Sequence, residues 1–447
     1  MRIDRRIRVI AIWIVLATAV VALPADLRAA EPTVTAIVPG VVDRTSLDLT
    51  ATYDVAATLV TATGRLRVST SIDLRNDSGG PIDRVELNLL PLRVGAYHQG
   101  DVLVDDRPVA PVRSDQTLIV PLGGILPDGA SARIRVGYDA AFSTSTTGTR
   151  WMFSRAGGAY AAYRWIPWIS RVTPFDRPNF GDPFVTPVSP RVTVHIASDR
   201  ELGIATSGRR AAGGDALHKE YVAERVRDFT FVAGASYRAL LGLHGATEIR
   251  AWAPTATVRR ALLAEARRAL TALEARLGPY PYPTFVVAST PGGWGMESPG
   301  AVWIPRATRS SNLRYLVTHE TAHQWFYGLV GNDQARQPFA DEAAADFVAR
   351  RVLGLRRASR CAKADLDRSI YGYSSACYYE VVYIQGGNKL DAFGILIGGP
   401  AFWSAIRSYL ADHRFGMGST RALLDAIDAA TPLDMVPRYQ ARFPRIY

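Results

Sequence analysis

One stretch of sequence, residues 318–325, constrains this chain more than any other. It contains His319, Glu320 and His323, and apolar residues recur around it at helical spacing: Leu313, Leu316, Val317, Phe326 and Leu329. This pattern predicts a buried helix, with Ser310 or Ser311 capping its start and Gly331 ending it. Histidines four positions apart on a helix share one face, so two imidazoles can bind a single metal ion.

A third ligand is expected from Glu342, nineteen positions after His323. It lies in residues 341–348, which the sequence predicts to begin a second helix after Pro338. Two histidines and one glutamate are a known ligand set for catalytic zinc, which keeps its fourth position open for water. We therefore predict one Zn²⁺ per chain, bound by His319, His323 and Glu342.

His-Glu-x-x-His with this distal glutamate, flanked by Gln-Trp-Phe and an Asp-Glu pair, resembles the motif of the aminopeptidase N family of gluzincin metallopeptidases. Two further segments agree in order and spacing. Residues 295–300, Gly-Met-Glu-Ser-Pro-Gly, are similar to the family's Gly-Ala-Met-Glu-Asn segment, which binds the amino end of the substrate. Residues 383–386, Tyr-Ile-Gln-Gly, resemble its Tyr-x-Lys-Gly segment. Ser298 and Gln385 depart from the family pattern.

The resemblance implies a role for each matching residue. Glu320 is expected to act as the general base, and Tyr383 to stabilise the oxyanion that forms on the substrate. The backbone at Gly295 and Met296 is expected to pair with an extended peptide, while Glu297 holds its free α-ammonium.

Two assignments have alternatives nearby. Tyr378 and Tyr379 compete with Tyr383 for the catalytic role. Asp346, four positions after Glu342, is expected to accept a hydrogen bond from the outer nitrogen of a zinc histidine; the alternative is an ordinary solvated aspartate.

The N-terminal half of the chain alternates apolar and polar residues with period two. Clear cases are Leu66, Val68, Ile72 and Leu74, then Ile134, Val136 and Tyr138, then Val192, Val194 and Ile196. We predict an α+β protein: an antiparallel β-sandwich-like domain over residues 31–246 is followed by a thermolysin-like, mainly helical catalytic domain over 247–447. Large family members continue into a helical domain that roofs the cleft. Here the resemblance implies a two-domain form without it.

The second domain is expected to open with a long amphipathic helix over residues 258–277, closed by Gly278. A strand is expected over residues 282–288. In the first domain, the aromatic residues 160–168 replace the family's amine-reading sequence. We interpret these rings as packing residues rather than substrate contacts.

The N-terminus resembles an export signal. A positive segment over residues 1–8 precedes an apolar run over residues 9–23 and small residues up to Ala30. The run is shorter than a spanning helix prefers, so we expect a cleaved signal over residues 1–30, with an uncleaved membrane anchor as the alternative. In an exported protein the two cysteines, Cys361 and Cys377, are expected to form a disulfide.

Positive charge is plentiful but scattered. Lys and Arg number 52 against 41 Asp and Glu, and the only lysines are Lys219, Lys363 and Lys389. Arginine pairs recur along the chain without clustering, so we predict no nucleic-acid partner.

The leading hypothesis is an exported, extracytoplasmic zinc metallopeptidase that releases N-terminal residues from peptide or protein substrates. One alternative is a relaxed or endo-acting peptidase, since part of the family's amine-reading set is replaced. The other is a catalytically silent binding or scaffold protein with the same fold. The sequence does not determine the oligomeric state.

Overall fold

The computed structural model describes residues 36–172, 182 and 184–447. These described residues belong to one compact unit. The predicted export signal over residues 1–30 lies outside them and stays a prediction. Among the described residues, no helix combines the length and the apolar character needed to cross a bilayer.

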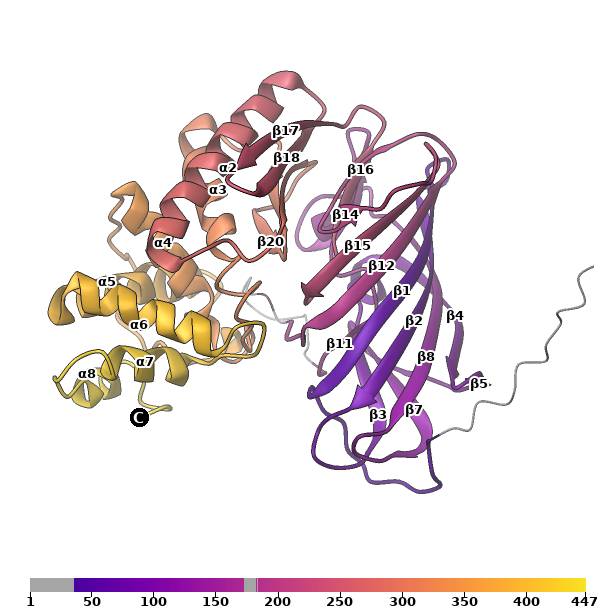
Figure 1. Cartoon of the computed structure of the whole chain (residues 1–447), viewed down its shortest axis with the longest axis horizontal. Helices are drawn as coiled ribbons and strands as arrows, with labels where there is room; N and C mark the ends of the chain where they lie inside the picture. The colour runs from indigo at the N-terminus through magenta and orange to yellow at the C-terminus, as the bar shows by residue number, and fades with distance from the viewer. Residues whose placement is uncertain (1–35, 173–181, 183) are drawn as a thin grey trace, which may run out of the picture. The chain divides into compact units, whose positions relative to one another are not determined.

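The first part of the chain folds into three β-sheets. The largest has eight strands in the order β14-β15-β12-β1-β2-β8-β4-β5, and Figure 1 shows its central strands as a twisted layer. Its strands are β1 (Leu49–Val60), β2 (Arg65–Asn76), β4 (Ala96–Val104), β5 (Arg107–Pro108), β8 (Ser131–Ala141), β12 (Ser189–Ser198), β14 (Arg209–Arg210) and β15 (His218–Val226). Neighbouring strands run antiparallel except β1 and β12, which pair in parallel.

Two smaller sheets have four strands each. One has the order β13-β16-β10-β9 and the other β11-β3-β7-β6. Their strands are β3 (Ile82–Asn88), β6 (Val112–Ser114), β7 (Thr117–Leu126), β9 (Phe153–Ala156), β10 (Ala159–Ala162), β11 (Trp168–Ile169), β13 (Gly203–Thr206) and β16 (Phe231–Gly234). A short helix, α1 (Pro91–Val94), follows β3.

The period-two pattern explains why these strands form a sandwich. Along β2, side chains alternate between buried and exposed positions, and the predicted apolar residues are the buried ones. The large sheet contacts the sheet of β11, where Tyr53 of β1 stacks on Trp168 with ring centroids 4.2 Å apart. The Tyr53 hydroxyl also accepts a hydrogen bond from the Ile169 amide at 3.1 Å. The predicted β-sandwich-like domain is confirmed, with one parallel pair added.

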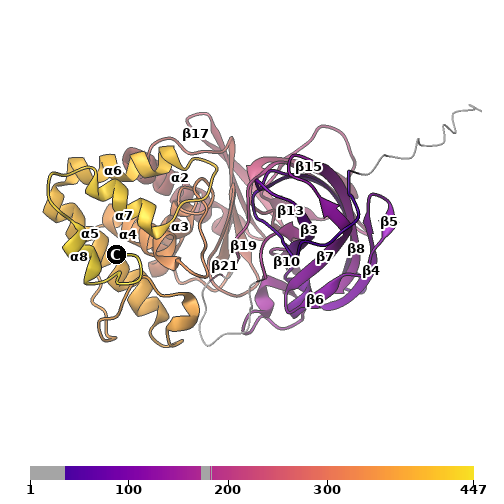
Figure 2. The ribbon, with the colours of Figure 1, turned by 90° about the horizontal axis from the view of Figure 1, so that it is seen from below.

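The second part of the chain combines a five-stranded sheet with helices. The sheet order is β17-β18-β19-β21-β20. Its strands are β17 (Arg238–His244), β18 (Thr247–Ala253), β19 (Thr284–Thr290), β20 (Met296–Ser298) and β21 (Ala301–Pro305). The main helices are α2 (Ala256–Leu277), α3 (Ser310–Ala322), α4 (Glu342–Leu353), α5 (Gly386–Ile397), α6 (Gly399–Asp412), α7 (Thr420–Asp428) and α8 (Val436–Gln440), which gather together in Figure 2.

Helix α2 shows how the sequence builds this part. Thr255 caps its start by accepting a hydrogen bond from the Val258 amide, and Gly278, with φ of +95°, ends it. The apolar face predicted from residues 258–277 is buried, and α2 packs on the hairpin of β17 and β18. The predicted helical second domain is therefore confirmed. Its predicted start at residue 247 stays a prediction. Thr247 is the first residue of β18, which pairs with β17 across the preceding turn.

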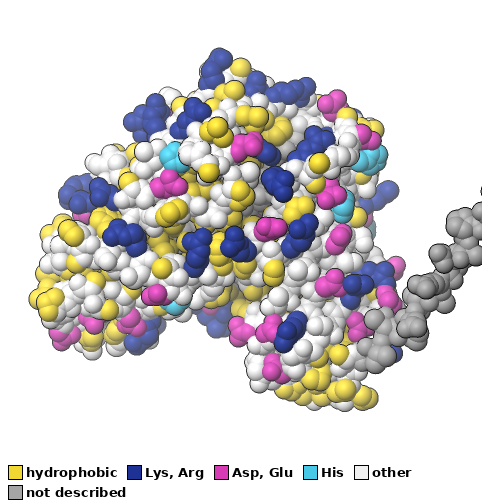
Figure 3. Space-filling view, viewed as in Figure 1, with side chains coloured by type: hydrophobic (Ala, Val, Ile, Leu, Met, Phe, Trp, Pro, Cys, Tyr) yellow, Lys and Arg dark blue, Asp and Glu magenta, His cyan; other side chains and the backbone are white. Residues whose placement is uncertain are grey.

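The surface charges are interspersed on the face drawn in Figure 3. Lys and Arg side chains lie singly or in small groups there, with Asp and Glu between them. Several arginines are paired with carboxylates, as Arg133 is with Asp73 at 2.5 Å. This arrangement agrees with solvated surface arginines.

Candidate metal centre

The two histidines of the motif lie at the C-terminal end of α3. His319 is in its last turn and His323 is its C-cap residue. Both side chains are buried, and their Nε2 atoms are 3.3 Å apart. The helical spacing therefore brings the two imidazoles to one point, as predicted.

Helix α3 is shorter than the sequence predicts. Arg309 occupies its N-cap position without a side-chain cap, and the helix ends at Ala322 rather than at Gly331. Tertiary contacts draw the following residues out of the helix. The Gln324 side chain accepts from the Gly300 amide at 2.7 Å and donates to the Ser298 carbonyl at 3.0 Å, while Tyr327 has φ of +118° and donates to Asp228.

Glu342 completes the group as the first residue of α4. Its Oε2 atom is 3.5 Å from His319 Nε2 and 3.4 Å from His323 Nε2. With the 3.3 Å separation of the histidines, these atoms form a nearly equilateral triangle. Tetrahedral zinc ligands at roughly 2.0–2.1 Å from the ion are about 3.3–3.4 Å apart, so the triangle has the size of one face of a zinc site.

The hydrogen bonding around the triangle also fits a cation. His323 Nδ1 lies 2.7 Å from Asp341 Oδ1, so this carboxylate can accept from Nδ1 while Nε2 faces the other two groups of the triangle. His319 Nε2 and the Glu342 carboxylate point at the same place. Buried lone pairs that face one another repel, and Glu342 Oε2 has no hydrogen-bond donor in the described structure. The residues therefore fit a zinc ion, as predicted.

Asp341, and not Asp346, supports a metal histidine, so the prediction for Asp346 is wrong. The Asp346 side chain accepts hydrogen bonds from the Tyr315 hydroxyl and from Arg350 Nε, the latter at 2.6 Å. It lies one turn into α4, where it faces these partners instead of an imidazole. Asp346 is fully buried, so the alternative of a solvated aspartate is wrong as well.

Asp341 and Gln334 are the residues that sequence reasoning missed. Asp341 directly precedes α4, and its second oxygen accepts from Gln334 Nε2 at 2.5 Å. The same Gln334 nitrogen lies 3.3 Å from Glu297 Oε1, so one amide connects the metal group with the predicted amine-binding carboxylate. The Asp-Glu pair was visible in the sequence, but nothing local indicated which imidazole its first member would meet. Gln334 carries no sequence signal.

Two further carboxylates lie beside the triangle. Oxygens of Glu297 and Glu320 and a nitrogen of His323 all lie within 4.8 Å of one another. Burial raises the pKa of Glu297 to about 8 and that of Glu320 well above its ordinary value, because a charged carboxylate loses its hydration here. Their position beside the metal group places these carboxyl groups where they can exchange a proton with a reacting molecule.

Gly295 is required by the close approach of β20 to α3. A Cβ atom added at this position would lie 1.9 Å from Glu320 Oε1 and 2.8 Å from a Leu316 methyl group. The following strand, β20, pairs with β21 on one side and ends the sheet on the other within the described residues. Its outer edge and the backbone of Met296 can therefore accept an extended peptide beside Glu320.

Tyr383 approaches the same centre from a six-residue π-helix, η4 (Glu380–Gln385). Its ring stacks on the imidazole of His319 with centroids 5.7 Å apart. Burial and the nearby Glu342 carboxylate raise the pKa of its phenol well above the ordinary value, so the group stays a proton donor. Tyr379 is engaged elsewhere, because its hydroxyl accepts from Arg357. Of the three candidate tyrosines, Tyr383 is the one that stacks on a metal-site histidine.

The aromatic residues 160–168 form packing contacts. Tyr163 and Trp165 are fully buried, and their rings contact those of Trp303 and Phe231. Arg164 between them is also buried and donates to the Tyr327 hydroxyl at 2.6 Å. The interpretation of this segment as packing agrees with these contacts.

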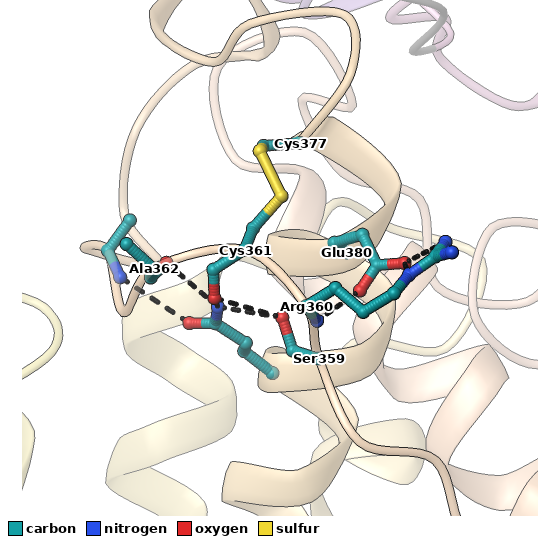
Figure 4. The surroundings of a disulfide bond; sticks show 8 residues. Ser359, Arg360, Cys361, Ala362, Cys377 and Glu380 are labelled. Carbon is teal, nitrogen blue, oxygen red and sulfur yellow. Dashed lines mark hydrogen bonds and ion pairs between the residues drawn. A yellow bond between two sulfur atoms is a disulfide. The ribbon is translucent and has the colours of Figure 1, made fainter.

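The predicted disulfide is present. Cys361 and Cys377 are joined, with Cα atoms 5.9 Å apart, and Figure 4 shows the bond beside η4.

Neither the protein-family models nor the curated proteins matched this sequence. Solved structures did match. A mutant M1 zinc metallopeptidase from Deinococcus radiodurans superposes with a TM-score of 0.67 at 18% identity, covering 91% of this chain and 96% of that one. The chain has the fold of a two-domain M1 zinc metallopeptidase.

Two other structures from the same organism support this assignment of the fold. The M1 zinc metallopeptidase without the mutation gives a TM-score of 0.64 at 19% identity, over 89% of this chain and 93% of that one. The mutant bound to a Tyr-Ser-Ala substrate gives 0.65 at 18% identity, over 91% and 96%. The resemblance predicted from the zinc motif is thus confirmed at the level of the two-domain M1 fold.

Proposed function

We propose that this protein is a zinc peptidase that releases residues from the free amino end of peptides. The observation that carries the proposal is the triangle of His319, His323 and Glu342, whose atoms are 3.3–3.5 Å apart with Glu320 beside them. The shared fold and the tripeptide bound to one of the similar structures support it.

Zinc at this site would act as a Lewis acid that polarises the scissile carbonyl and lets water lose a proton near pH 7. Glu320 would accept that proton and later deliver it to the leaving amine, since it adjoins the metal group without belonging to it. Tyr383 would donate its phenolic proton in a hydrogen bond to the carbonyl oxygen as negative charge develops.

The amino end of the substrate would meet Glu297. Its buried carboxylate would form a charge-assisted hydrogen bond with the α-ammonium, while β20 pairs with the peptide backbone through its free edge. An extended peptide could also pass along this edge beyond Glu297. The endo-acting alternative therefore differs from the proposal only in whether cleavage requires an α-ammonium bound to Glu297.

The experiment is hydrolysis of a panel of aminoacyl-naphthylamides and matched N-acetylated peptides. Wild type and Glu320→Gln are compared, with zinc content measured on both. We expect cleavage of free amines only, abolished in the variant while zinc stays bound. Equal cleavage of acetylated peptides would replace the proposal with an endo-acting peptidase, and zinc binding without hydrolysis would favour a binding role.

We also propose that the protein acts outside the cytoplasm. The predicted signal over residues 1–30 and the Cys361–Cys377 disulfide support this, because disulfides persist in oxidising compartments. Cell fractionation with mass measurement of the mature N-terminus tests it. An intact N-terminus in the membrane fraction would indicate an anchor, and a cytoplasmic location would refute export.

A further inference from the structure

The π-helix η4 (Glu380–Gln385), which carries Tyr383, is anchored at both ends to a single loop, residues 359–364. A π-helix is a rare conformation that seldom exceeds one or two turns and often marks a functional site. Six residues in this conformation need support from their surroundings. The contacts of η4 therefore decide where the Tyr383 ring lies.

Gln385 anchors the C-terminal end of η4. Its side-chain nitrogen lies within hydrogen-bond distance of three loop acceptors: Ser359 Oγ at 3.0 Å, the Cys361 carbonyl at 3.1 Å and the Ala362 carbonyl at 3.0 Å. Its side-chain oxygen accepts from the Ala364 amide at 3.4 Å. One buried amide thus replaces water for several polar groups of the loop.

Glu380 anchors the N-terminal end. One of its oxygens accepts from the Arg360 amide at 2.8 Å, and the other accepts from two nitrogens of the Arg360 guanidinium at 2.7 and 3.1 Å. Figure 4 shows these two residues facing each other beside the disulfide. The loop residues that bind Glu380 and Gln385 are adjacent in sequence.

The disulfide adds a covalent connection to the same loop. Cys361 belongs to the loop, and Cys377 lies three residues before Glu380. The loop is also fixed to the C-terminal region, because Arg442 donates to the Ala364 carbonyl at 2.6 Å and to Gln385 Oε1 at 2.8 Å.

On its other side η4 is packed against α4. Arg350 of α4 donates to the Tyr383 carbonyl at 3.3 Å. At Gly386, a Cβ atom would lie 2.7 Å from the Ala343 Cβ, so the backbones approach closely there. The segment is therefore held between the helix that supplies Glu342 and the loop that binds Glu380 and Gln385.

We propose that Glu380, Gln385 and the Cys361–Cys377 disulfide are positioning groups that hold η4 so that the Tyr383 phenol faces the substrate carbonyl. This inference rests on the proposed catalytic role of Tyr383. None of the three groups touches the metal triangle itself, so they act through the placement of the tyrosine. A displacement of about 1 Å at a catalytic group can cost on the order of a hundredfold in rate.

A matched control separates positioning from simple stabilisation. Asn76 of β2 is a buried amide whose side-chain nitrogen also meets three carbonyls, those of Gly80, Leu126 and Pro127, at 2.9–3.1 Å. Gln385→Met and Asn76→Leu each remove one amide that serves three acceptors. Both variants should lose folding stability, but only Gln385→Met should affect Tyr383.

The experiment measures kcat, KM, zinc content and amide hydrogen exchange for wild type, Gln385→Met, Asn76→Leu and the double variant Cys361→Ser/Cys377→Ser. We expect Gln385→Met and the double cysteine variant to lower kcat about tenfold with KM within about twofold and full zinc content. Exchange should accelerate in residues 380–385. Asn76→Leu should leave kcat and this exchange unchanged.

A cycle with Tyr383→Phe identifies the route of the effect. If the loop acts through the phenol, Gln385→Met should lower kcat by less than about twofold once the phenol is gone. The same tenfold loss in the Tyr383→Phe background would overturn the proposal, as would equal kcat values for Gln385→Met and Asn76→Leu. If the wild type cleaves no peptide, the proposed function fails. In that case, amide hydrogen exchange of residues 380–385 that stays unchanged in the variants would still refute the anchoring of η4 by the loop.

Discussion

Replacing Asp341 by asparagine should weaken zinc binding without removing a metal ligand. Asp341 is 1% exposed, and both of its oxygens are engaged, one by His323 Nδ1 at 2.7 Å and the other by Gln334 Nε2 at 2.5 Å. Asparagine keeps the shape of the side chain but loses the charge that raises the basicity of His323. Loss of such a partner typically costs 10–100-fold in metal affinity, or about 1.4–2.8 kcal/mol.

The assay is competition for zinc with a chromophoric chelator, applied to wild type, Asp341→Asn and Asp346→Asn. Asp346 is the matched control because it is equally buried and lies in α4, the helix that Asp341 precedes. It binds Tyr315 and Arg350 instead of an imidazole. We expect a 10–100-fold weaker Kd for Asp341→Asn and a change below about threefold for Asp346→Asn. Equal effects of the two variants would refute the assignment of Asp341 as the partner of His323.

Three further predictions concern the site and its support. Gly295→Ala places a Cβ within 1.9 Å of Glu320, so kcat should fall on the order of a hundredfold at full zinc content; unchanged kinetics would show that Glu320 is not confined there. Chelation of the metal should abolish hydrolysis. Restoring zinc to about 100 times its Kd should raise the free energy of unfolding by about 2.7 kcal/mol in a denaturant titration. An unchanged free energy of unfolding would argue against a metal held by the folded triangle. The Arg164 guanidinium lies 3.8 Å from the Asp228 carboxylate and 3.7 Å from that of Asp182, and Arg164→Met removes this buried cation. Urea titration should then show a free energy of unfolding lower by about 3–5 kcal/mol, and a decrease below about 1 kcal/mol would refute this pairing.

The edge strand β20 connects the five-stranded sheet with the candidate site. It is the last strand of the five-stranded sheet within the described residues, and Gly295 brings its start against Glu320.

Local pattern was sufficient for the features that depend on neighbours in sequence. The four-residue spacing of His319 and His323 requires only a helix to bring their imidazoles together. The helical face of α2 and the alternation in β2 follow from the burial of apolar side chains at periods of 3.6 and two. The distal Glu342 was also identified from its residue type and position, and the Cys361–Cys377 pair from the presence of two cysteines in a chain with a predicted export signal.

The tertiary structure decided what depends on partners distant in sequence. Asp341 rather than Asp346 meets His323, because the residue before α4 turns toward the imidazole while the one inside the helix faces α3. The end of α3 at Ala322 is set by contacts of Gln324 and Tyr327 with other segments. Spacing fixes which residues share a face, but side-chain direction depends on what packs against that face, and only the folded chain supplies those neighbours.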